Sequence, residues 1–416
     1  MGNLCRRSHN IVKRALTYDD INIIPKYSDI EHRDKIDIST KFTKNTELNI
    51  PIVSSPMDTV TEEDMAEELL DWGGVGVIHR FNTIEEQSRM MKSLHYQWDS
   101  WFDIGTNIRG DDEETTIDKE WNEWWNNYSR SNPPTKEDWK DLKDRFWWAD
   151  SMIRDEERWK KRPLCAAVGV TGDYLERAQE LVKNGCNVLL IDVAHGHHKL
   201  VKEGIRRLKN GLKGTYEIIG GSIATKEAAQ DLCDWGVDGV RVGIGNGSLC
   251  ETRIRTGVGI PQVTTLLDVC SVCDTYDVPV VADGGIRNIG DVCKGFGCGA
   301  DTIMLGSLLS GTKETPGDIS KVGLWPNEKL YKKYRGSASV ESKLDRGEIK
   351  NVEGNSKTVP YKGKIKRIID DILDGHKSSM SYVGASNLEE YRTLVKFVRV
   401  TQSGVREAFP FGLNKE

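Results

Sequence analysis

Short, continuous apolar runs recur along the chain, and segments with helical character separate them. Each run is rich in β-branched residues, and segments such as 171–185 and 225–236 lie between successive runs. Continuous apolar strands that alternate with helices are typical of a parallel sheet whose two faces are both buried. Eight such strands, separated by helices, predict a (β/α)8 barrel, the TIM-barrel class of α/β fold. The runs occupy 50–60, 73–81, 164–170, 188–196, 216–224, 239–244, 278–286 and 302–311.

Polar residues and glycines follow the predicted strands at the point where each strand ends. In (β/α)8 barrels the active site lies at the carboxyl ends of the strands. We therefore expect the functional site on this face of the barrel. The residues at these positions include Ser55, Met57, Asp192, Gly221, Cys250, Asp283 and Ser307.

One segment interrupts the alternation of strands and helices between the second and third apolar runs. It extends from Leu94 to Pro163, contains nine of the twelve tryptophans and includes an acidic stretch. We therefore expect a first barrel segment (1–93), a helical insertion (94–163) and a second barrel segment (164–416). The second segment contains the glycine-rich loop at 239–262, a flap after the eighth strand and a C-terminal segment. The tryptophans are interpreted as the local core of a small helical cap. A surface for a ligand or another subunit is the alternative.

Composition and charge exclude several classes of function. Charged residues make up 29% of the 416 positions and hydrophobic residues 38%, which is typical of a soluble protein. The net charge of −6 does not favour nucleic acid as a partner, and no apolar run reaches the roughly 18 residues of a membrane span. The nine cysteines lie at irregular spacings, so we do not expect structural zinc. Free thiols are typical of the reducing cytosol, which predicts a cytoplasmic protein.

The segment Gly239–Gln262 carries the strongest chemical signal. A buried strand ends in a glycine-rich loop, and a single thiol, that of Cys250, follows the glycines. Glycine allows the backbone to approach a ligand closely, and a cysteine on such a loop is a candidate nucleophile. A hydroxyl lies two residues further on, at Thr252. A small buried cysteine on a tight turn is the alternative. The glycines of the loop are Gly243, Gly245 and Gly247.

The sequences GNGSLCETR and TGVGIPQ within this segment resemble the catalytic loop of the IMP dehydrogenase and GMP reductase family. The resemblance covers most of residues 15–410 and skips the insertion. It implies that the Cys250 thiolate attacks carbon 2 of the purine in a nucleoside monophosphate, forming a covalent adduct. In the dehydrogenase, hydride passes from IMP to NAD and water then releases XMP. In the reductase, ammonia leaves GMP and NADPH returns a hydride to give IMP.

The resemblance also implies roles for particular residues. Thr252 corresponds to a hydroxyl that helps with proton transfer, Glu353 to a carboxylate on a mobile flap, and Arg346 to the flap residue that activates water. For the cofactor, NAD or NADP, the resemblance implies Asp192, with Gly243 and Gly245. It further implies a homotetramer and K+ or a similar monovalent cation. The expected cation ligands are the backbone carbonyls of Gly245, Gly247 and Cys250, with Glu407 from a neighbouring subunit.

Two glycine loops follow the seventh and eighth predicted strands, at Ala282–Arg287 and Met304–Gly311. Barrels of this class often bind phosphate at this pair of loops, through backbone N–H groups and a helix N-terminus. We therefore expect the nucleotide phosphate there, with Asp283 accepting hydrogen bonds from the ribose. The other expected substrate-binding residues are Ser55, Met57, Ser248, Gly285, Gly306, Ser307, Tyr334 and Gly336.

The flap, residues 334–363, bears on the direction of the reaction. Dehydrogenases of the family carry an Arg–Tyr pair there, whereas Arg346 is followed by Gly347. Glu353 resembles a carboxylate that the reductases use with the threonine, and KGFGCGADTIMLG and DILDG also resemble the reductase. LNIPIVSSPMDTVTE, VIHRFNTIEEQ, VADGGIR and GTKETPGD resemble the dehydrogenase. IMP dehydrogenase is the leading hypothesis, GMP reductase is the alternative, and a non-catalytic nucleotide-binding relative is the third.

Overall fold

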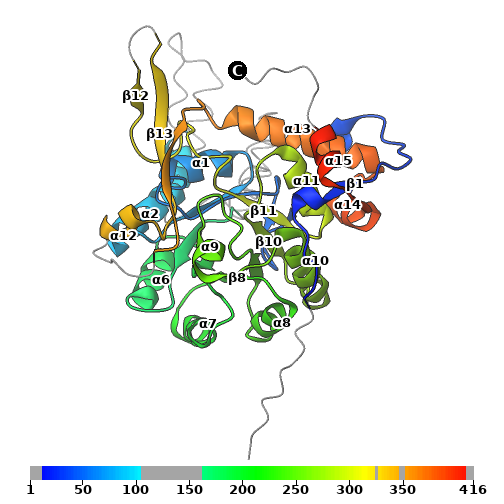
Figure 1. The fold of residues 1–416 in the computed structure, drawn as a ribbon. Helices are drawn as coiled ribbons and strands as arrows, with labels where there is room; N and C mark the ends of the chain where they lie inside the picture. The colour runs from blue at the N-terminus through cyan, green and yellow to red at the C-terminus, as the bar shows by residue number, and fades with distance from the viewer. Residues whose placement is uncertain (1–11, 105–161, 324–326, 346–351, 409–416) are drawn as a thin grey trace, which may run out of the picture.

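Eight parallel strands close into a barrel at the centre of the molecule (Figure 1). The computed structural model describes residues 12–104, 162–323, 327–345 and 352–408. Neighbouring strands around the barrel follow the order of the chain, and the last pairs with the first through Met304 opposite Val53. The strands are β4 (Ile52–Ser54), β5 (Val75–Ile78), β6 (Cys165–Val168), β7 (Val188–Ile191), β8 (Glu217–Ile223), β9 (Gly239–Val242), β10 (Val280–Asp283) and β11 (Thr302–Leu305).

A helix lies between each strand and the next around the outside of the barrel (Figure 1). Local sequence signals start several of these helices, because a side chain caps the first free backbone N–H groups. Thr225 accepts from the N–H of Ala228, and Asn288 accepts from that of Asp291. The (β/α)8 prediction is confirmed. The helices are α1 (Glu63–Asp71), α2 (Ile84–Ile104), α6 (Tyr174–Lys183), α7 (Lys199–Gly211), α8 (Lys226–Asp234), α10 (Gln262–Cys273), α11 (Ile289–Gly297) and α13 (Lys366–Val383).

The strands bury both of their faces, which explains why they are apolar throughout. Alternate residues, such as Val188 and Leu190, belong to a cluster inside the barrel, whereas Leu189 and Ile191 belong to the cluster that includes the helices. A short hairpin of β2 (Thr40–Lys41) and β3 (Glu47–Leu48) adds Phe42 and Leu48 to the inner cluster. The backbone of Phe42 lies against Gly239 at the start of β9. The hairpin therefore covers the amino ends of the strands and leaves the carboxyl ends for the site.

The two ends of the described chain meet beside the barrel. Strand β1 (Ile21–Ile23) pairs antiparallel with β15 (Phe397–Arg399), and Figure 1 shows β1 close to α14 and α15. Tyr18, just before β1, is buried and adds to the core. The remaining short elements of this region and of the loops are η1 (Tyr18–Asp20), η2 (Arg33–Lys35), η3 (Asp274–Tyr276), α14 (Leu388–Leu394) and α15 (Gln402–Glu407).

A small antiparallel sheet forms the flap between β11 and α13. The β12–β13 hairpin projects from the barrel, and the pairing of Tyr334 with Lys357 brings β14 alongside β13 (Figure 1). Next to the flap, a short helix follows the glycine-rich loop of β9. These elements are β12 (Ser320–Val322), β13 (Lys329–Arg335), α12 (Val340–Asp345), β14 (Ser356–Pro360) and α9 (Thr252–Thr256).

The predicted insertion begins within a helix rather than after one. Helix α2 continues to Ile104, so the predicted boundary after residue 93 falls inside it, and Leu94 is buried in the barrel core. The remainder of the insertion, 105–161, lies outside the described residues, and so does the predicted cap. None of the helices in the described part of the chain is long and apolar enough to cross a membrane.

Candidate active site

A cavity of about 660 Å³ opens at the carboxyl ends of the barrel strands. With the exceptions of Gly221 and Glu407, the expected site residues that the structure describes line it, although they come from distant parts of the chain. Arg346 lies outside the described residues, and Glu407, on α15, is not among the described residues that line the cavity. The expected residues that line it are Ser55, Met57, Asp192, Gly243, Gly245, Gly247, Ser248, Cys250, Thr252, Asp283, Gly285, Gly306, Ser307, Tyr334, Gly336 and Glu353.

The glycine-rich loop brings the candidate nucleophile into the cavity. At Gly243, φ is +146°, and a Cβ there would lie 2.0 Å from the carbonyl oxygen of Asp283. Only glycine fits this close approach of β9 to β10. Gln262 at the start of α10 ties the same two strand ends together, because its side-chain amide donates to the carbonyls of Val242 and Asp283 at 2.9 and 3.2 Å. The exposed Cys250 is thus held on a rigid base.

A thiol, a hydroxyl and a carboxylate form one hydrogen-bonded chain. The Cys250 thiol donates to the Thr252 hydroxyl at 3.1 Å, and this hydroxyl donates to the Glu353 carboxylate at 2.8 Å. Cys250 is exposed to the cavity, which is inconsistent with the alternative of a buried core cysteine. The arrangement gives a proton a path between the sulfur and a carboxylate, as general acid–base catalysis requires.

The flap reaches this chain through backbone contacts with the catalytic loop. The N–H of Glu251 donates to the carbonyl of Glu353 at 2.8 Å, and the N–H of Asn355 donates to that of Leu249 at 3.0 Å. Residues 353–355 therefore lie along residues 249–251, and Cys250 is bridged to Gly354. These backbone hydrogen bonds fix the position of Glu353, so that its carboxylate lies next to Thr252.

The expected phosphate cradle lies across the cavity at Gly306. A Cβ added there would lie 3.2 to 3.4 Å from Tyr334 Oη, Ser55 Oγ and Met57 Sδ, so three side-chain ends converge on the glycine. The Tyr334 hydroxyl lies 3.0 Å from Ser248 Oγ, and burial raises the pKa of Tyr334 to about 12. Tyr334 therefore stays protonated and keeps a donor for an anionic ligand.

A lysine that the sequence did not indicate supports this cradle. Lys362 Nζ donates to the carbonyls of Ser307 and Leu308 at 3.0 and 2.9 Å. The Lys362 cation beside these carbonyl oxygens polarises the peptide groups. Their N–H groups, on the opposite side, therefore attract an anion more strongly. Its position in the flap, far from β11 in sequence, explains why pattern analysis missed it.

Charged residues form a second cluster on the other side of the cavity. Arg241 Nη2 donates to Asp192 Oδ1 at 2.9 Å, and Arg80 Nε lies 3.5 Å from the other oxygen. Burial opposes ionisation of Asp192, but the charges of Arg241 and Arg80 outweigh it and lower the pKa of the carboxyl group. Burial raises the pKa of Asp283, and Arg241, at 4.0 Å, acts against that rise. Asp192 is therefore an ionised carboxylate that two arginines hold in the cavity wall.

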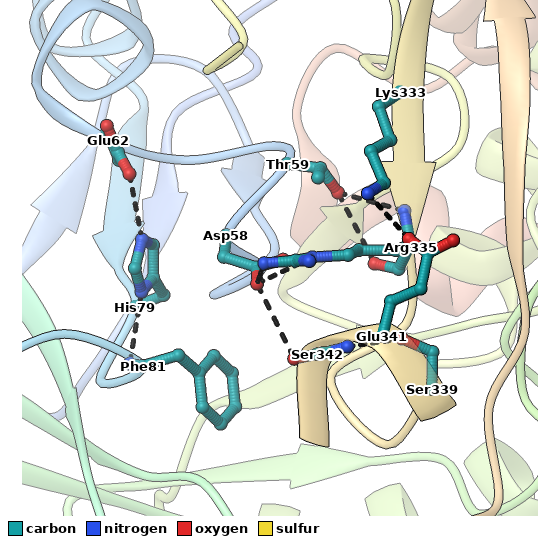
Figure 2. A network of polar contacts seen from close by, with 10 residues as sticks. All are labelled: Asp58, Thr59, Glu62, His79, Phe81, Lys333, Arg335, Ser339, Glu341 and Ser342. Carbon is teal, nitrogen blue, oxygen red and sulfur yellow. Dashed lines mark hydrogen bonds and ion pairs between the residues drawn. The ribbon is translucent and has the colours of Figure 1, made fainter. Parts of the chain in front are cut away.

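Sequence analysis missed both arginines. Arg241 interrupts an apolar strand, Gly-Val-Arg-Val, and a charged residue within a continuous buried run is a signal of a paired functional group. Arg80 follows His79, whose Nδ1 accepts from the N–H of Phe81 at 3.1 Å and whose Nε2 therefore donates to Glu62 (Figure 2). This histidine holds the loop that carries Arg80 toward Asp192.

The fold and the cavity define a (β/α)8-barrel protein with a cysteine-centred site that a flap helps to build. Residues 15–411 match the family model described as the IMP dehydrogenase / GMP reductase domain. Because that model spans nearly the whole sequence, the chain belongs to this family. Its members are NAD(P)-dependent purine nucleotide oxidoreductases, so the chain belongs to a family of enzymes of that class.

Individual relatives match along almost their full length. The chain is 36% identical to the inosine-5′-monophosphate dehydrogenase of Borreliella burgdorferi, over 97% of this chain and 98% of that protein. It is 34% identical to the dehydrogenase of Cryptosporidium parvum, over 95% of each. Among solved structures, a GMP reductase variant from Trypanosoma brucei in complex with guanosine 5′-monophosphate has a TM-score of 0.80 at 30% identity and covers 97% of this chain and 99% of its own.

Proposed function

We propose that the chain is an IMP dehydrogenase that converts IMP, NAD and water to XMP and NADH. The observation that carries the covalent chemistry, which both candidate reactions require, is the hydrogen-bonded chain from Cys250 through Thr252 to Glu353. It supplies a nucleophile and a proton acceptor in one cavity. The full-length identity to curated dehydrogenases favours this direction of reaction.

Cys250, Thr252 and Glu353 have separate roles in the proposed reaction. The Cys250 sulfur forms a bond to carbon 2 of the purine, and its proton passes through the Thr252 hydroxyl toward Glu353. NAD, when bound, accepts the hydride that leaves carbon 2. Once Glu353 has released that proton to solvent, the same carboxylate and hydroxyl take a proton from the attacking water. The water oxygen bonds to carbon 2, and the sulfur leaves carbon 2 and is reprotonated, which gives XMP and the free thiol.

The two sides of the cavity fit the two ligands. Because Gly306 has no side chain, the N–H groups of its loop are open to a phosphate that the Tyr334 hydroxyl can also contact. The ionised Asp192, held by Arg241 and Arg80, suits the ribose hydroxyls of a dinucleotide. Asp283, between these sides, is proposed to hold the ribose of IMP.

GMP reductase is the second candidate. The contact between Thr252 and Glu353 is the pair that resembles the reductase, where it would manage the proton of departing ammonia. The similarity to a solved GMP reductase also favours it. In this direction carbon 2 loses ammonia first and receives a hydride from NADPH in the second step.

A parallel assay of the full chain separates these candidates. IMP with NAD and GMP with NADPH are followed by the absorbance of the reduced nicotinamide, which appears in the first reaction and disappears in the second. We expect turnover with IMP and NAD. Turnover with GMP and NADPH alone would assign the reductase, and tight nucleotide binding without either reaction would assign a non-catalytic relative.

Three further proposals accompany this function. The carbonyls of Gly245, Gly247 and Cys250 are proposed to bind K+, for which carbonyl oxygens are suitable ligands; the Gly247 carbonyl would then be shared with the N–H of Cys250, 3.1 Å away. A K+-dependent rise in melting temperature, absent with Li+, would support that site. A homotetramer is proposed, to be tested by light scattering. A cytoplasmic location is supported by the eight free thiols among the described cysteines.

A further inference from the structure

An ion pair joins the flap to the loop that follows the first barrel strand. Arg335, at the end of β13, donates from Nε and Nη2 to the same oxygen of Asp58, at 2.9 and 2.7 Å (Figure 2). Only 9% of the Asp58 side chain and 16% of the Arg335 side chain are exposed. Little water screens the pair, so its attraction is stronger than that of a surface pair.

The backbone of Arg335 is fixed to the same loop. Its N–H donates to Thr59 Oγ1 at 3.1 Å, and the Thr59 hydroxyl lies 3.3 Å from its carbonyl oxygen. Ser342, on α12, contributes a weaker contact of 3.5 Å to Asp58 (Figure 2). The side chain and the main chain of one flap residue are therefore both held by positions 58 and 59.

The residues next to this pair form two walls of the nucleotide site. Met57 precedes Asp58, while Tyr334 precedes Arg335 and Gly336 follows it; all three line the cavity. The two walls converge on Gly306, where an added Cβ would contact both Tyr334 Oη and Met57 Sδ. The ion pair therefore sets the distance between the wall from β4 and the wall from the flap.

The same pair is connected to the acid–base chain. The N–H of Gly336, next to Arg335, donates to the carbonyl of Asn355 at 2.9 Å, and the carbonyl of Ala338 accepts from the N–H groups of Glu353 and Gly354 at 3.1 Å each. A shift of Arg335 would thus move the segment that presents Glu353 to Thr252.

We propose that Asp58 and Arg335 are positioning residues, which couple closure of the nucleotide cradle to the placement of Glu353. This inference rests on the proposed function only in that it names the same cavity and the same proton acceptor. A buried pair costs desolvation, which an apolar contact would avoid. The two N–H groups of Arg335 are directed at one carboxylate oxygen, so they fix the position of the flap. An apolar contact is not directional and would allow the flap to shift.

The exposed ion pair between Lys333 and Glu341 provides a matched control. It joins β13 to α12 directly at 2.6 Å, whereas Arg335 and Ser342 each contact Asp58, and about half of each of its side chains is exposed. Screened pairs of this kind contribute little. Lys333→Met therefore removes one cation from the same strand without touching Asp58.

The test compares Asp58→Asn, Arg335→Met, Arg335→Lys and Lys333→Met in the full chain. We expect Asp58→Asn and Arg335→Met to raise the calorimetric Kd for the mononucleotide by about tenfold, because the two walls separate. Arg335→Lys keeps the charge and one donor, and should recover part of that loss. Lys333→Met should stay within about twofold of wild type. A rise of less than about threefold in both Asp58→Asn and Arg335→Met would overturn the proposal.

A second measurement separates coupling from simple loss of structure. In single turnover, Asp58→Asn should slow the chemical step in the wild-type background but add little in a Glu353→Gln background, because both changes act on the same group. Full additivity of the two rate effects would refute the coupling. If Asp58→Asn does not fold, Arg335→Lys takes its place in both measurements. Nucleotide binding is measured without turnover, so a wild-type chain that lacks activity would count against the proposed function alone.

Discussion

The Thr252 hydroxyl donates a 2.8 Å hydrogen bond to the carboxylate of Glu353, 101 positions further along the chain. One residue opens α9 after the catalytic loop, and the other lies in the flap. Because the proposed proton acceptor lies on a separate element, its side chain can be replaced while the proposed nucleophile stays in place. Five experiments use this and other contacts of the structure.

Replacing the thiol tests covalent catalysis. Cys250→Ala should lower kcat by a factor on the order of 10³ or more, because no other group at this position can form the adduct. The Kd for the mononucleotide should change little, since the side chain is exposed and bears no part of the fold. Calorimetry and steady-state rates measure the two effects. A variant with near wild-type turnover would exclude Cys250 as the nucleophile.

Replacing the proton acceptor tests the direction of reaction. Glu353→Gln keeps the shape of the side chain but cannot take a proton from Thr252. If GMP is the substrate, release of ammonia should fall by about 10²-fold or more, in the range typical of a lost general acid or base. If IMP is the substrate, the first hydride transfer should lose less than the hydrolytic step, which gives a burst of NADH followed by a slow phase. Equal turnover of the variant and wild type would remove Glu353 from the proton path.

A single methyl group tests the phosphate cradle. Gly306→Ala places a Cβ 3.2 to 3.4 Å from Tyr334 Oη, Ser55 Oγ and Met57 Sδ, which are side-chain ends that can yield. We expect a mononucleotide affinity about tenfold weaker, equivalent to about 1.4 kcal/mol, with little change in melting temperature. Gly285 is a poorer choice, because its φ of +81° strains any other residue. Unchanged affinity in Gly306→Ala would move the phosphate to another part of the cavity.

A buried histidine predicts the response of the fold to acid. His376 packs between Phe296 and Tyr391, neither ring nitrogen has a hydrogen-bond partner, and burial lowers its pKa to about 3. The ordinary pKa of histidine is 6.5. As the pH falls below this value, His376 binds a proton in the unfolded chain but stays neutral in the folded chain. Stability that is complete above pH 6.5 is therefore lost on acidification, by about 2 kcal/mol at pH 5.

His376→Phe should remove this part of the pH dependence. Denaturant unfolding at pH 7 and pH 5 measures it, and a change at the exposed His32 serves as the control. The variant and wild type should differ more in their free energy of unfolding at pH 5 than at pH 7. An identical loss of stability in the two proteins would show that other groups carry the acid response.

Removing the insertion tests the proposed division of the chain. Because α2 extends to Ile104 and Leu94 is buried, the replacement must leave these residues in place. Arg162, which pairs with Asp71 at 3.4 Å, marks the other end. We expect a chain with a Gly-Ser linker in place of 105–161 to fold and turn over substrate, because the cut lies between two complete β-α units. An insoluble or inactive product would assign the segment to the barrel or to a subunit contact.

The sequence predicted the barrel well because the physical signal of each strand is local. A strand such as β7, buried on both faces, must be apolar throughout, and this shows in the sequence as an uninterrupted run. The glycine loops were equally readable, since a close approach such as that of Gly243 to Asp283 admits no other residue. Helix α2, in contrast, continues beyond the expected boundary, because nothing in its sequence marks a stop before Ile104.

Pairings between distant positions could not be predicted in the same way. Asp58 and Arg335 stand within segments that pattern analysis examined, yet neither attracts attention alone, because only the fold brings two ordinary charged residues together. The sequence shows the charge of Arg241 within β9 but not its partner. Asp192 follows β7, which is separated from β9 by β8 in the barrel. Composition and spacing identify which groups a site contains; contacts across the cavity decide which of them act in concert.

The pairing of β1 with β15 affects the order in which the chain can fold during its synthesis. A strand near the start of the chain finds its partner almost at the end, and at ordinary ribosomal speeds the wait lasts on the order of tens of seconds. Tyr18 likewise waits for its contacts near Gly285 and Gly295 to be synthesised, and the thiol of Cys250 emerges before the carboxylate of Glu353. The nascent chain thus carries the proposed nucleophile for roughly 5–20 s before the proposed proton acceptor is made.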